Sequence, residues 1–199
     1  MNVCKNVDTP MEHHVCILVE GMLKSPSMVY LNLSHNCFSN SGVAELCKLW
    51  NSENSVLAVL NVCNNAISVD GAKIIGESLR DNEVLVSLNL RHNPIEDDGG
   101  QAIFVALQSN MTMQRLCVSA CGVGERTAAS VQRLLQNPRS GLIALDISAN
   151  RYIGVTGGFA IYSGLVNILL SSLARIILVL CHYLDIYHLH YLCSRFLYM

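Results

Sequence analysis

A pattern that recurs every 28 or 29 residues constrains this chain more than any other feature of its sequence. Its clearest copy lies in residues 85–110, where Leu85, Leu88, Leu90 and Asn93 follow the spacing L-x-x-L-x-L-x-x-N. The leucines alternate as in a short strand, and the residues after Gly99 carry an apolar helical stripe. One strand and one helix cannot bury both apolar faces alone, so each unit needs copies of itself beside it.

Four further copies are present, and they open at Met28, Leu57, Met113 and Leu142. Each copy has a pair of apolar strand residues that we expect to point into a continuous core: Leu31/Leu33, Leu60/Val62, Leu88/Leu90, Leu116/Val118 and Leu145/Ile147. Five such units predict an α/β leucine-rich-repeat solenoid of the ribonuclease-inhibitor-like subtype. In that fold parallel strands line the concave face and helices cover the convex face.

Three regions are expected along the chain. Residues 1–27 form an N-terminal segment, and the apolar residues between Glu12 and Lys24 suit the helix of a truncated repeat. Residues 28–158 form the array of about five repeats, and residues 159–199 form a hydrophobic tail outside the pattern. Because the array begins in mid-unit and shows no polar cap, we expect the chain to be part of a longer protein.

The tail permits three interpretations. Residues 165–184 are nearly all apolar and long enough to span a membrane, but Arg175 near the middle would cost about 2.5–3.5 kcal/mol. The other interpretations are a poorly packed capping segment and a non-native tail from an incorrect gene model. We favour the last, because the pattern breaks inside a repeat, and we do not expect a membrane partner.

Composition excludes some classes of function. The net charge of −2 offers no basic footprint for nucleic acid. Nine cysteines are scattered, odd in number and mostly at repeat positions, so we expect free thiols in a reducing cytosol. No secretory signal peptide is evident at the N-terminus.

Two sets of repeated polar residues are candidate sites. The first ends the strands, where a side-chain amide can satisfy backbone groups of its own turn and of the neighbouring repeat; it comprises Asn36, Asn65, Asn93, Cys121 and Asn150. The second lies between the core positions and should face outward on the concave sheet as a partner-binding strip. Its candidate residues are Asn32, His35, Asn61, Asn89, Arg91, His92, Arg115 and Asp146, in which the arginines and histidines form a modest basic spot.

No catalytic or cofactor motif emerges, so we expect neither an enzyme nor a cofactor. The stretch GVGERT at 122–127 lacks the lysine of a phosphate-binding loop, and no HExxH occurs. Cys117 and Cys121 lack a second ligand pair at metal spacing, and a cluster of His182, His188 and His190 lies in the tail. Asp97 and Asp98 are most simply solvated turn residues.

Three segments carry a resemblance to a known family. LNLRHNPIEDDGGQAIFVALQSN at 88–110 is similar to the leucine-rich-repeat subunits of the nexin–dynein regulatory complex. LNLSHN at 31–36 and SANRYIGVTGG at 148–158 also resemble repeats of that family. The resemblance covers about residues 28–158 and does not extend into the tail.

The resemblance implies a non-catalytic scaffold in the axoneme of motile cilia and flagella, within the cytoplasm and cytoskeleton. Its partners would be other subunits of the complex and axonemal proteins, with no nucleic acid and no small-molecule substrate. The alternative is a cytosolic repeat module of another kind, either a ribonuclease-inhibitor-like inhibitor or the repeat region of an immune receptor. An inhibitor of that kind would be expected to carry many acidic and aromatic concave residues, and here only Tyr30 and Asp146 qualify.

Overall fold

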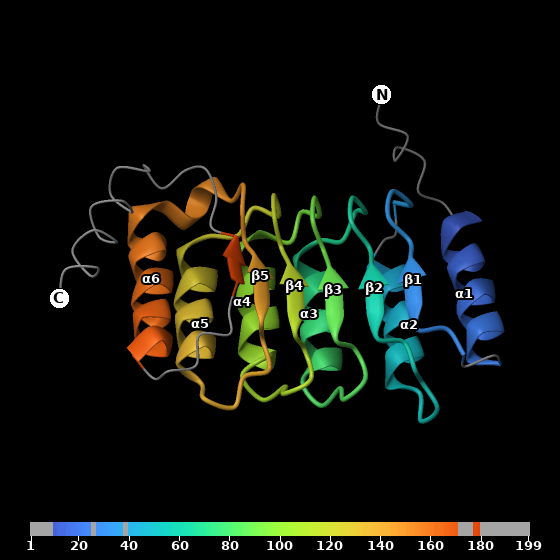
Figure 1. Cartoon of the computed structure of the whole chain (residues 1–199). Coiled ribbons are helices and arrows are strands. Elements are labelled where there is room, and N and C mark those ends of the chain that lie inside the picture. The colour runs from blue at the N-terminus through green and yellow to red at the C-terminus, as the bar shows by residue number, and fades with distance from the viewer. Residues whose placement is uncertain (1–9, 25–26, 38–39, 171–176, 180–199) are drawn as a thin grey trace.

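The computed structural model describes residues 10–24, 27–37, 40–170 and 177–179. Within these ranges helices and strands alternate along the chain (Figure 1). The elements are α1 (Pro10–Leu23), β1 (Tyr30–Asn32), α2 (Asn40–Asn51), β2 (Val59–Asn61), α3 (Val69–Leu79), β3 (Ser87–Asn89), α4 (Glu96–Ala106), β4 (Arg115–Cys117), α5 (Glu125–Gln136), β5 (Ala144–Asp146), the 3-10 turn η1 (Arg151–Ile153), α6 (Gly154–Leu170) and β6 (Ile177–Val179).

The strands form one parallel sheet in which each pairs with the next along the chain, from β1 to β6. The pairing follows the repeat, because equivalent residues face one another across every pair of strands. The middle residues lie in one row, Leu31, Leu60, Leu88, Leu116, Leu145 and Leu178. A period of 28 or 29 residues therefore becomes a sheet with no slip of register from β1 to β5.

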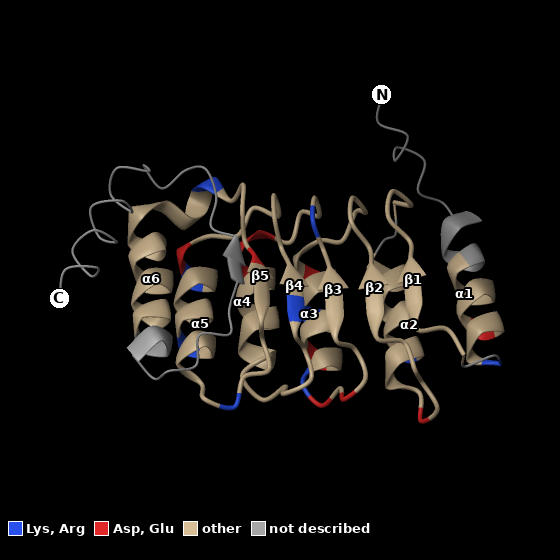
Figure 2. Ribbon diagram, in the orientation of Figure 1, with Lys and Arg blue, Asp and Glu red and all other residues tan. Residues whose placement is uncertain are grey.

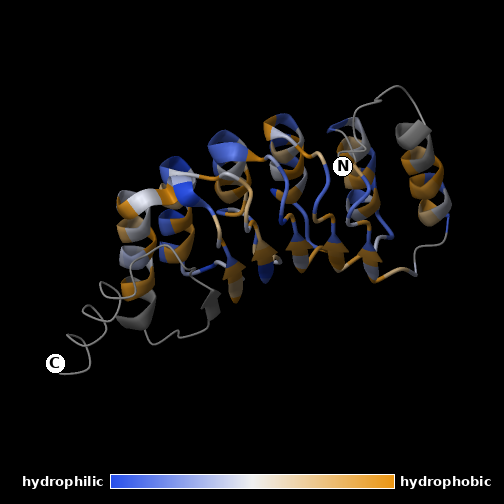
Figure 3. Cartoon of the chain, turned by 90° about the horizontal axis from the view of Figure 1, so that it is seen from above, coloured by the Kyte–Doolittle hydropathy of each residue, from blue (hydrophilic) through white to orange (hydrophobic). Residues whose placement is uncertain are grey.

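The core lies between this sheet and the layer of helices. Leu88 and Leu90 are 1% and 0% exposed, and the corresponding pairs of the second, fourth and fifth repeats are equally buried. Viewed from above, the strands follow the inner side of a gentle curve and the helices the outer side (Figure 3). The prediction of an α/β leucine-rich-repeat solenoid with concave strands and convex helices is confirmed.

Small residues set the distance between neighbouring helices. A Cβ atom added to Gly99 of α4 would lie 2.7 Å from the Cβ of Ala72 in α3, so these two helices touch at a glycine. In α5 the equivalent position is Thr127, and there the glycine is on the other helix: a Cβ on Gly100 would lie 2.5 Å from the Thr127 Oγ1. The pair exchanges its small member and keeps the close approach.

The array extends farther than the expected boundary at residue 158. The fifth helix, α6, continues to Leu170 and packs against α5. Its apolar face replaces the leucine pattern that ends there. The extra residue between Asn150 and Gly157 is absorbed by η1, in which the Ile153 N–H donates to the Asn150 carbonyl at 3.2 Å. Strand β6 then joins the sheet beside β5.

The remaining expectations for the two ends have mixed outcomes. Helix α1 forms where the sequence predicted it and packs on α2. Among the described residues, no helix has the length and apolar character needed to cross a membrane. Arg175 and the histidines of the tail lie outside the described residues. Cys37 is disulfide-bonded, so the expectation of free thiols is wrong for this residue, whereas Cys16, Cys47, Cys63, Cys117 and Cys121 are free.

Candidate functional site

The concave side of the sheet carries rows of side chains in register. The third residues of the strands, Asn32, Asn61, Asn89, Cys117 and Asp146, stand opposite one another from β1 to β5. Asn32 is exposed, and the other four are half-buried. Because successive strand residues point to opposite sides, this row faces away from the core.

These residues also shape the turns that follow their strands. The Oδ1 atoms of Asn32, Asn61, Asn89 and Asp146 each accept the backbone N–H two residues later, at 3.0 or 3.1 Å. One side-chain oxygen of each residue is therefore committed to the fold. The amide groups of the three asparagines and the second oxygen of Asp146 remain for other contacts, and the Asp146 Oδ2 accepts the Cys117 thiol at 3.4 Å.

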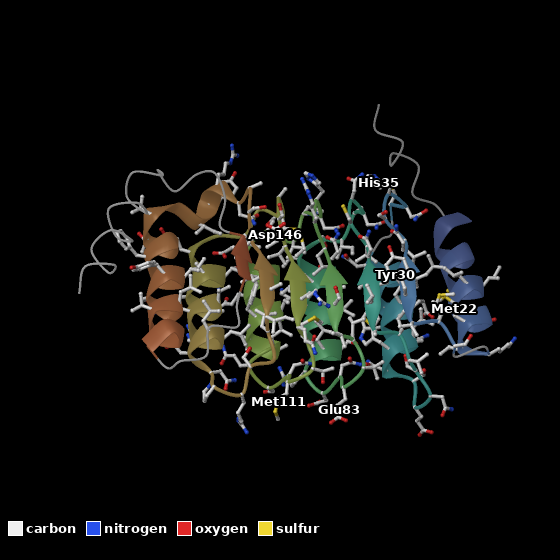
Figure 4. The ribbon with its side chains drawn as sticks, viewed as in Figure 1. Met22, Tyr30, His35, Glu83, Met111 and Asp146 are labelled. Carbon is white, nitrogen blue, oxygen red and sulfur yellow. The ribbon has the colours of Figure 1, made fainter. Side chains whose placement is uncertain are left out.

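The cationic candidates do not form one spot. Arg115 is exposed at the start of β4, opposite Ser87 of β3, whereas Arg91 follows the end of β3. Four residues of strand separate Ser87 from Arg91, or about 13 Å. His35, His92 and Arg91 lie in the loops after the strands, as Figure 2 shows for the arginines and Figure 4 for His35. The predicted basic spot is therefore split between the middle of the sheet and its loop edge.

The loop edge has a regular backbone geometry. His35, Asn64, His92, Ala120 and Ala149 occupy equivalent positions, and all have φ between 52° and 64°. This left-handed conformation turns the chain from the strand toward the helix. It also brings the Asn64 Nδ2 within 2.7 Å of the His35 Nδ1. The histidines of this edge are exposed.

The asparagine ladder lies beneath these loops and joins each repeat to its neighbours. The Nδ2 of Asn93 donates to the carbonyls of Val62, 3.0 Å away, and Leu90, 2.7 Å away. Its Oδ1 accepts the N–H groups of Asn65 and Ile67. Asn65 and Asn150 make the same contacts with their own neighbours. Each of these side chains satisfies backbone groups that would otherwise be buried and unpaired.

Cys121 fills the ladder position of the fourth repeat. Its Sγ donates to the Leu90 carbonyl at 3.1 Å and to the Ser119 carbonyl at 3.4 Å, which reproduces part of the asparagine pattern. Burial raises the pKa of the Cys121 thiol to about 12, although a backbone hydrogen bond from Asn93 acts in the other direction. The residue is 1% exposed and stays a neutral donor at physiological pH.

Asp97 has a role that the sequence did not reveal. Its carboxylate accepts the backbone N–H groups of Gly124, Arg126 and Thr127, at 2.8 to 3.1 Å, and so caps the first turn of α5 from the preceding repeat. Burial alone would raise its pKa, but these hydrogen bonds lower it below the ordinary value. Asp98 beside it is exposed and pairs with Arg126. The two acids are thus a helix cap and a surface ion pair, as neither was expected to be catalytic.

The Asp97 cap borders an open cavity of about 1030 Å³ between three successive loops. Its walls include His92, Glu96, Glu125 and Tyr152, which come from the third, fourth and fifth repeats. Tyr152 is the residue inserted by η1, and the Arg151 guanidinium lies 4.7 Å from the centre of its ring. The cavity therefore adds an acidic and aromatic surface to the loop edge.

A second asparagine ladder, at the opposite edge of the sheet, was also missed. The Nδ2 of Asn82 donates to the Trp50 carbonyl, and that of Asn110 donates to the carbonyls of Leu79 and Asn82, at 2.7 to 2.8 Å. Both side chains are nearly buried. The signal was available, because an asparagine stands three residues before the opening residue in the second, third and fourth repeats.

The described residues hold no arrangement for metal or nucleophilic chemistry. Within these ranges, no three His, Cys, Asp or Glu side chains come together in a way that could hold a metal ion. Burial raises the pKa of the Cys117 thiol to about 11, so this concave cysteine is a poor nucleophile at neutral pH. What the site offers is a broad polar sheet bordered by loops, and such a surface suits contact with another macromolecule.

Comparisons with known proteins support the fold. The model of the leucine-rich-repeat family matches residues 24–47 and 81–104. A solved structure of the leiomodin-1 actin-binding site 2 is similar with a TM-score of 0.63 and 21% identity, over 82% of this chain and 92% of that one. The tropomodulin C-terminal domain of Caenorhabditis elegans is similar with a TM-score of 0.55 and 17% identity, over 84% of this chain and 100% of that one. No curated protein sequence matches significantly.

Proposed function

We propose that this chain is a non-catalytic protein-binding module, and that it serves as a scaffold subunit of the nexin–dynein regulatory complex in the axoneme of motile cilia and flagella. The observation that carries the proposal is the set of outward-facing rows, from Asn32 to Asp146, held in register on the concave sheet. Five strands at about 4.8 Å spacing make this surface about 19 Å wide.

Rigidity favours binding on such a surface. The two asparagine ladders and the Asp97 cap lock each repeat to the next, so the rows keep their geometry without a partner. Little conformational entropy is then lost on binding, which favours affinity. Solenoids commonly bind partners on extended concave surfaces of this kind.

The axonemal assignment rests on the resemblance of residues 88–110. Part of that segment is dictated by the fold, since Leu88, Leu90 and Asn93 are buried. Arg91, His92 and Asp98, however, are exposed, so folding does not require their identity. Similarity at exposed positions supports a shared binding function more than similarity at core positions does.

Charge reversal at the arginines tests the proposal. We expect the double variant Arg91→Glu/Arg115→Glu to lose capture of other dynein regulatory complex subunits from an axonemal extract, at least tenfold, while its thermal unfolding is unchanged. The matched control is Arg80→Glu/Arg139→Glu, which makes the same charge change at exposed residues that follow helices α3 and α5, away from the concave rows. Equal capture by both variants, or a tagged full-length protein that does not localise to the axoneme, would refute the assignment.

Actin binding is a second candidate, favoured by the likeness to a leiomodin domain whose title names an actin-binding site. In this case the chain would be a cytoskeletal protein with actin as its partner. Co-sedimentation with actin filaments separates the candidates. A chain that pellets with filaments and fails to capture axonemal subunits supports the actin candidate, and the opposite result supports the axonemal one.

A further inference from the structure

The first strand of the array is less covered than every other strand of the repeat. Leu31 is 8% exposed where Leu60 and Leu88 are 1%, and Leu33 is only half-buried where Leu90 is 0% exposed. Met28 is 40% exposed, although the equivalent Leu57 and Leu85 are 3% and 0% exposed. Val29 and Tyr30 add exposures of 53% and 58%, and Figure 4 shows Tyr30 on this strand. The inner row of leucines therefore ends at an uncovered apolar edge.

The backbone of the same edge has a defined hydrogen-bonding pattern. Inside the array, the carbonyls of Asn61 and Cys63 accept the N–H groups of Leu33 and His35 from the preceding repeat, at 2.8 and 2.9 Å. The carbonyls of Asn89 and Arg91 accept those of Val62 and Asn64 in the same way. By this repetition the Asn32 and Ser34 carbonyls face outward from β1, the first strand of the sheet in the described part of the chain.

The asparagine ladder shows the same one-sided pattern. Asn65 and Asn93 donate to carbonyls of the preceding repeat, Leu33 and Val62. Asn36 donates to its own Ser34 carbonyl and is half-buried. Its side chain therefore stands ready to bond to a strand that precedes β1.

A helix already covers the place where such a strand would lie. Helix α1 packs on α2 just as α2 packs on α3, so the helix layer extends one position beyond β1 (Figure 1). Val15 and Val19 of α1 are buried in the core, whereas Ile17, Leu18 and Leu23 are exposed. Thus α1 offers an apolar cover for one more strand but leaves no room for another helix there.

We propose that the free edge of β1 binds an extended segment of a partner protein, which adds to the sheet as a parallel strand beneath α1. The segment carries apolar residues at two alternate positions, next to Leu31 and Leu33. Its N–H groups donate to the Asn32 and Ser34 carbonyls. This is β-strand addition, in which backbone hydrogen bonds provide affinity and alternate side chains provide specificity.

The overhang of α1 selects this occupant over a second copy of the chain. In a twofold pairing of β1 with β1, the α2 helix of the copy would have to lie where α1 already lies. A complete repeat from a partner meets the same obstacle, because it brings its own helix. A strand without a helix fits, and it uses a surface separate from the concave rows, so the two proposals fail independently.

The test uses a labelled peptide with the sequence of residues 84–93, VLVSLNLRHN, which reproduces an internal strand and its turn. Fluorescence anisotropy should show saturable binding to the full chain. A matched peptide is N-methylated at the positions of Leu90 and His92, whose N–H groups make the equivalent bonds inside the array. We expect it to bind at least tenfold more weakly, and peptide binding should slow amide hydrogen exchange at Tyr30 and Asn32.

Two variants of the chain complete the test. Asn36→Ala should weaken peptide binding severalfold with unchanged thermal unfolding, and Asn64→Ala, an exposed loop residue away from the edge, should bind normally. Equal binding of the methylated peptide, or unchanged exchange at Tyr30 and Asn32, would overturn the proposal. So would sedimentation that shows the chain pairing with itself in a way that the peptide competes away.

Discussion

The third and first repeats carry the same pattern, L-x-L-x-x-N, but neighbours cover them differently. In the third repeat Leu90 is 0% exposed and Asn93 is 1% exposed, with bonds to the repeats on each side. In the first repeat the equivalent Leu33 and Asn36 are half-buried. Identical residues thus differ in burial because a solenoid supplies each repeat with a core only through its neighbours. The predictions below test how much stability depends on that difference.

A charge in the inner row should have the largest effect. Leu90→Asp buries a carboxylate without a partner, and we expect it to lower the free energy of unfolding by about 4 kcal/mol or more. Leu33→Asp can reach solvent at the open edge and should cost about half as much. Urea unfolding followed by circular dichroism measures both. If Leu33→Asp proved as damaging as Leu90→Asp, burial by the neighbouring repeat would not be the cause.

The ladder should show the same asymmetry on a smaller scale. Asn93→Ala leaves the N–H groups of Asn65 and Ile67 and the carbonyls of Val62 and Leu90 without their partner. We expect a loss of about 3 kcal/mol, since each buried unpaired group costs about 1–3 kcal/mol and relaxation recovers part of it. Asn36→Ala should cost below about 1 kcal/mol. The same unfolding measurement applies, and equal losses would contradict the comparison.

The period predicted the elements that depend on a residue's place within its own repeat. The strand register and the burial of Leu88 and Leu90 follow from spacing alone, because side chains alternate along a strand. The extent of α6 did not follow, since a helix needs only an apolar face and continues after the leucine pattern has ended. Strand β6 lies 33 residues after β5, a spacing that the search for 28 or 29 could not detect.

Features that join repeats were harder to predict. The Asp97 cap links a carboxylate to N–H groups 27 to 30 residues away, so its role depends on how α4 and α5 dock. The sequence also placed Arg91 and Arg115 in one spot, because it counted outward positions without their height along the strand. Both misses concern distances between elements, and a one-dimensional pattern does not contain them.

Removal of the Asp97 cap should have an intermediate effect. Asp97→Ala leaves three N–H groups of the first turn of α5 without their acceptor, and we expect a loss of about 1 kcal/mol. The folded-state pKa of Asp97 is lowered, so its contribution is present above the unfolded value of 3.8 and is lost as the pH falls through the folded value. Unfolding at pH 7 and at about pH 3 checks this, because the gap between wild type and variant should shrink in acid.

The smallest expected effect comes from the fourth repeat, where a cysteine stands in the ladder. Cys121→Asn restores a stronger acceptor for the Asn93 N–H and a second amide donor, so we expect a gain of about 0.5 kcal/mol after the larger side chain is accommodated. Cys121→Ala removes the bonds to the Leu90 and Ser119 carbonyls and should instead lose about 1 kcal/mol. Urea unfolding at pH 7 ranks the three proteins. An asparagine variant less stable than the alanine variant would show that packing around Cys121, and not hydrogen bonding, decides which residue this position of the ladder accepts.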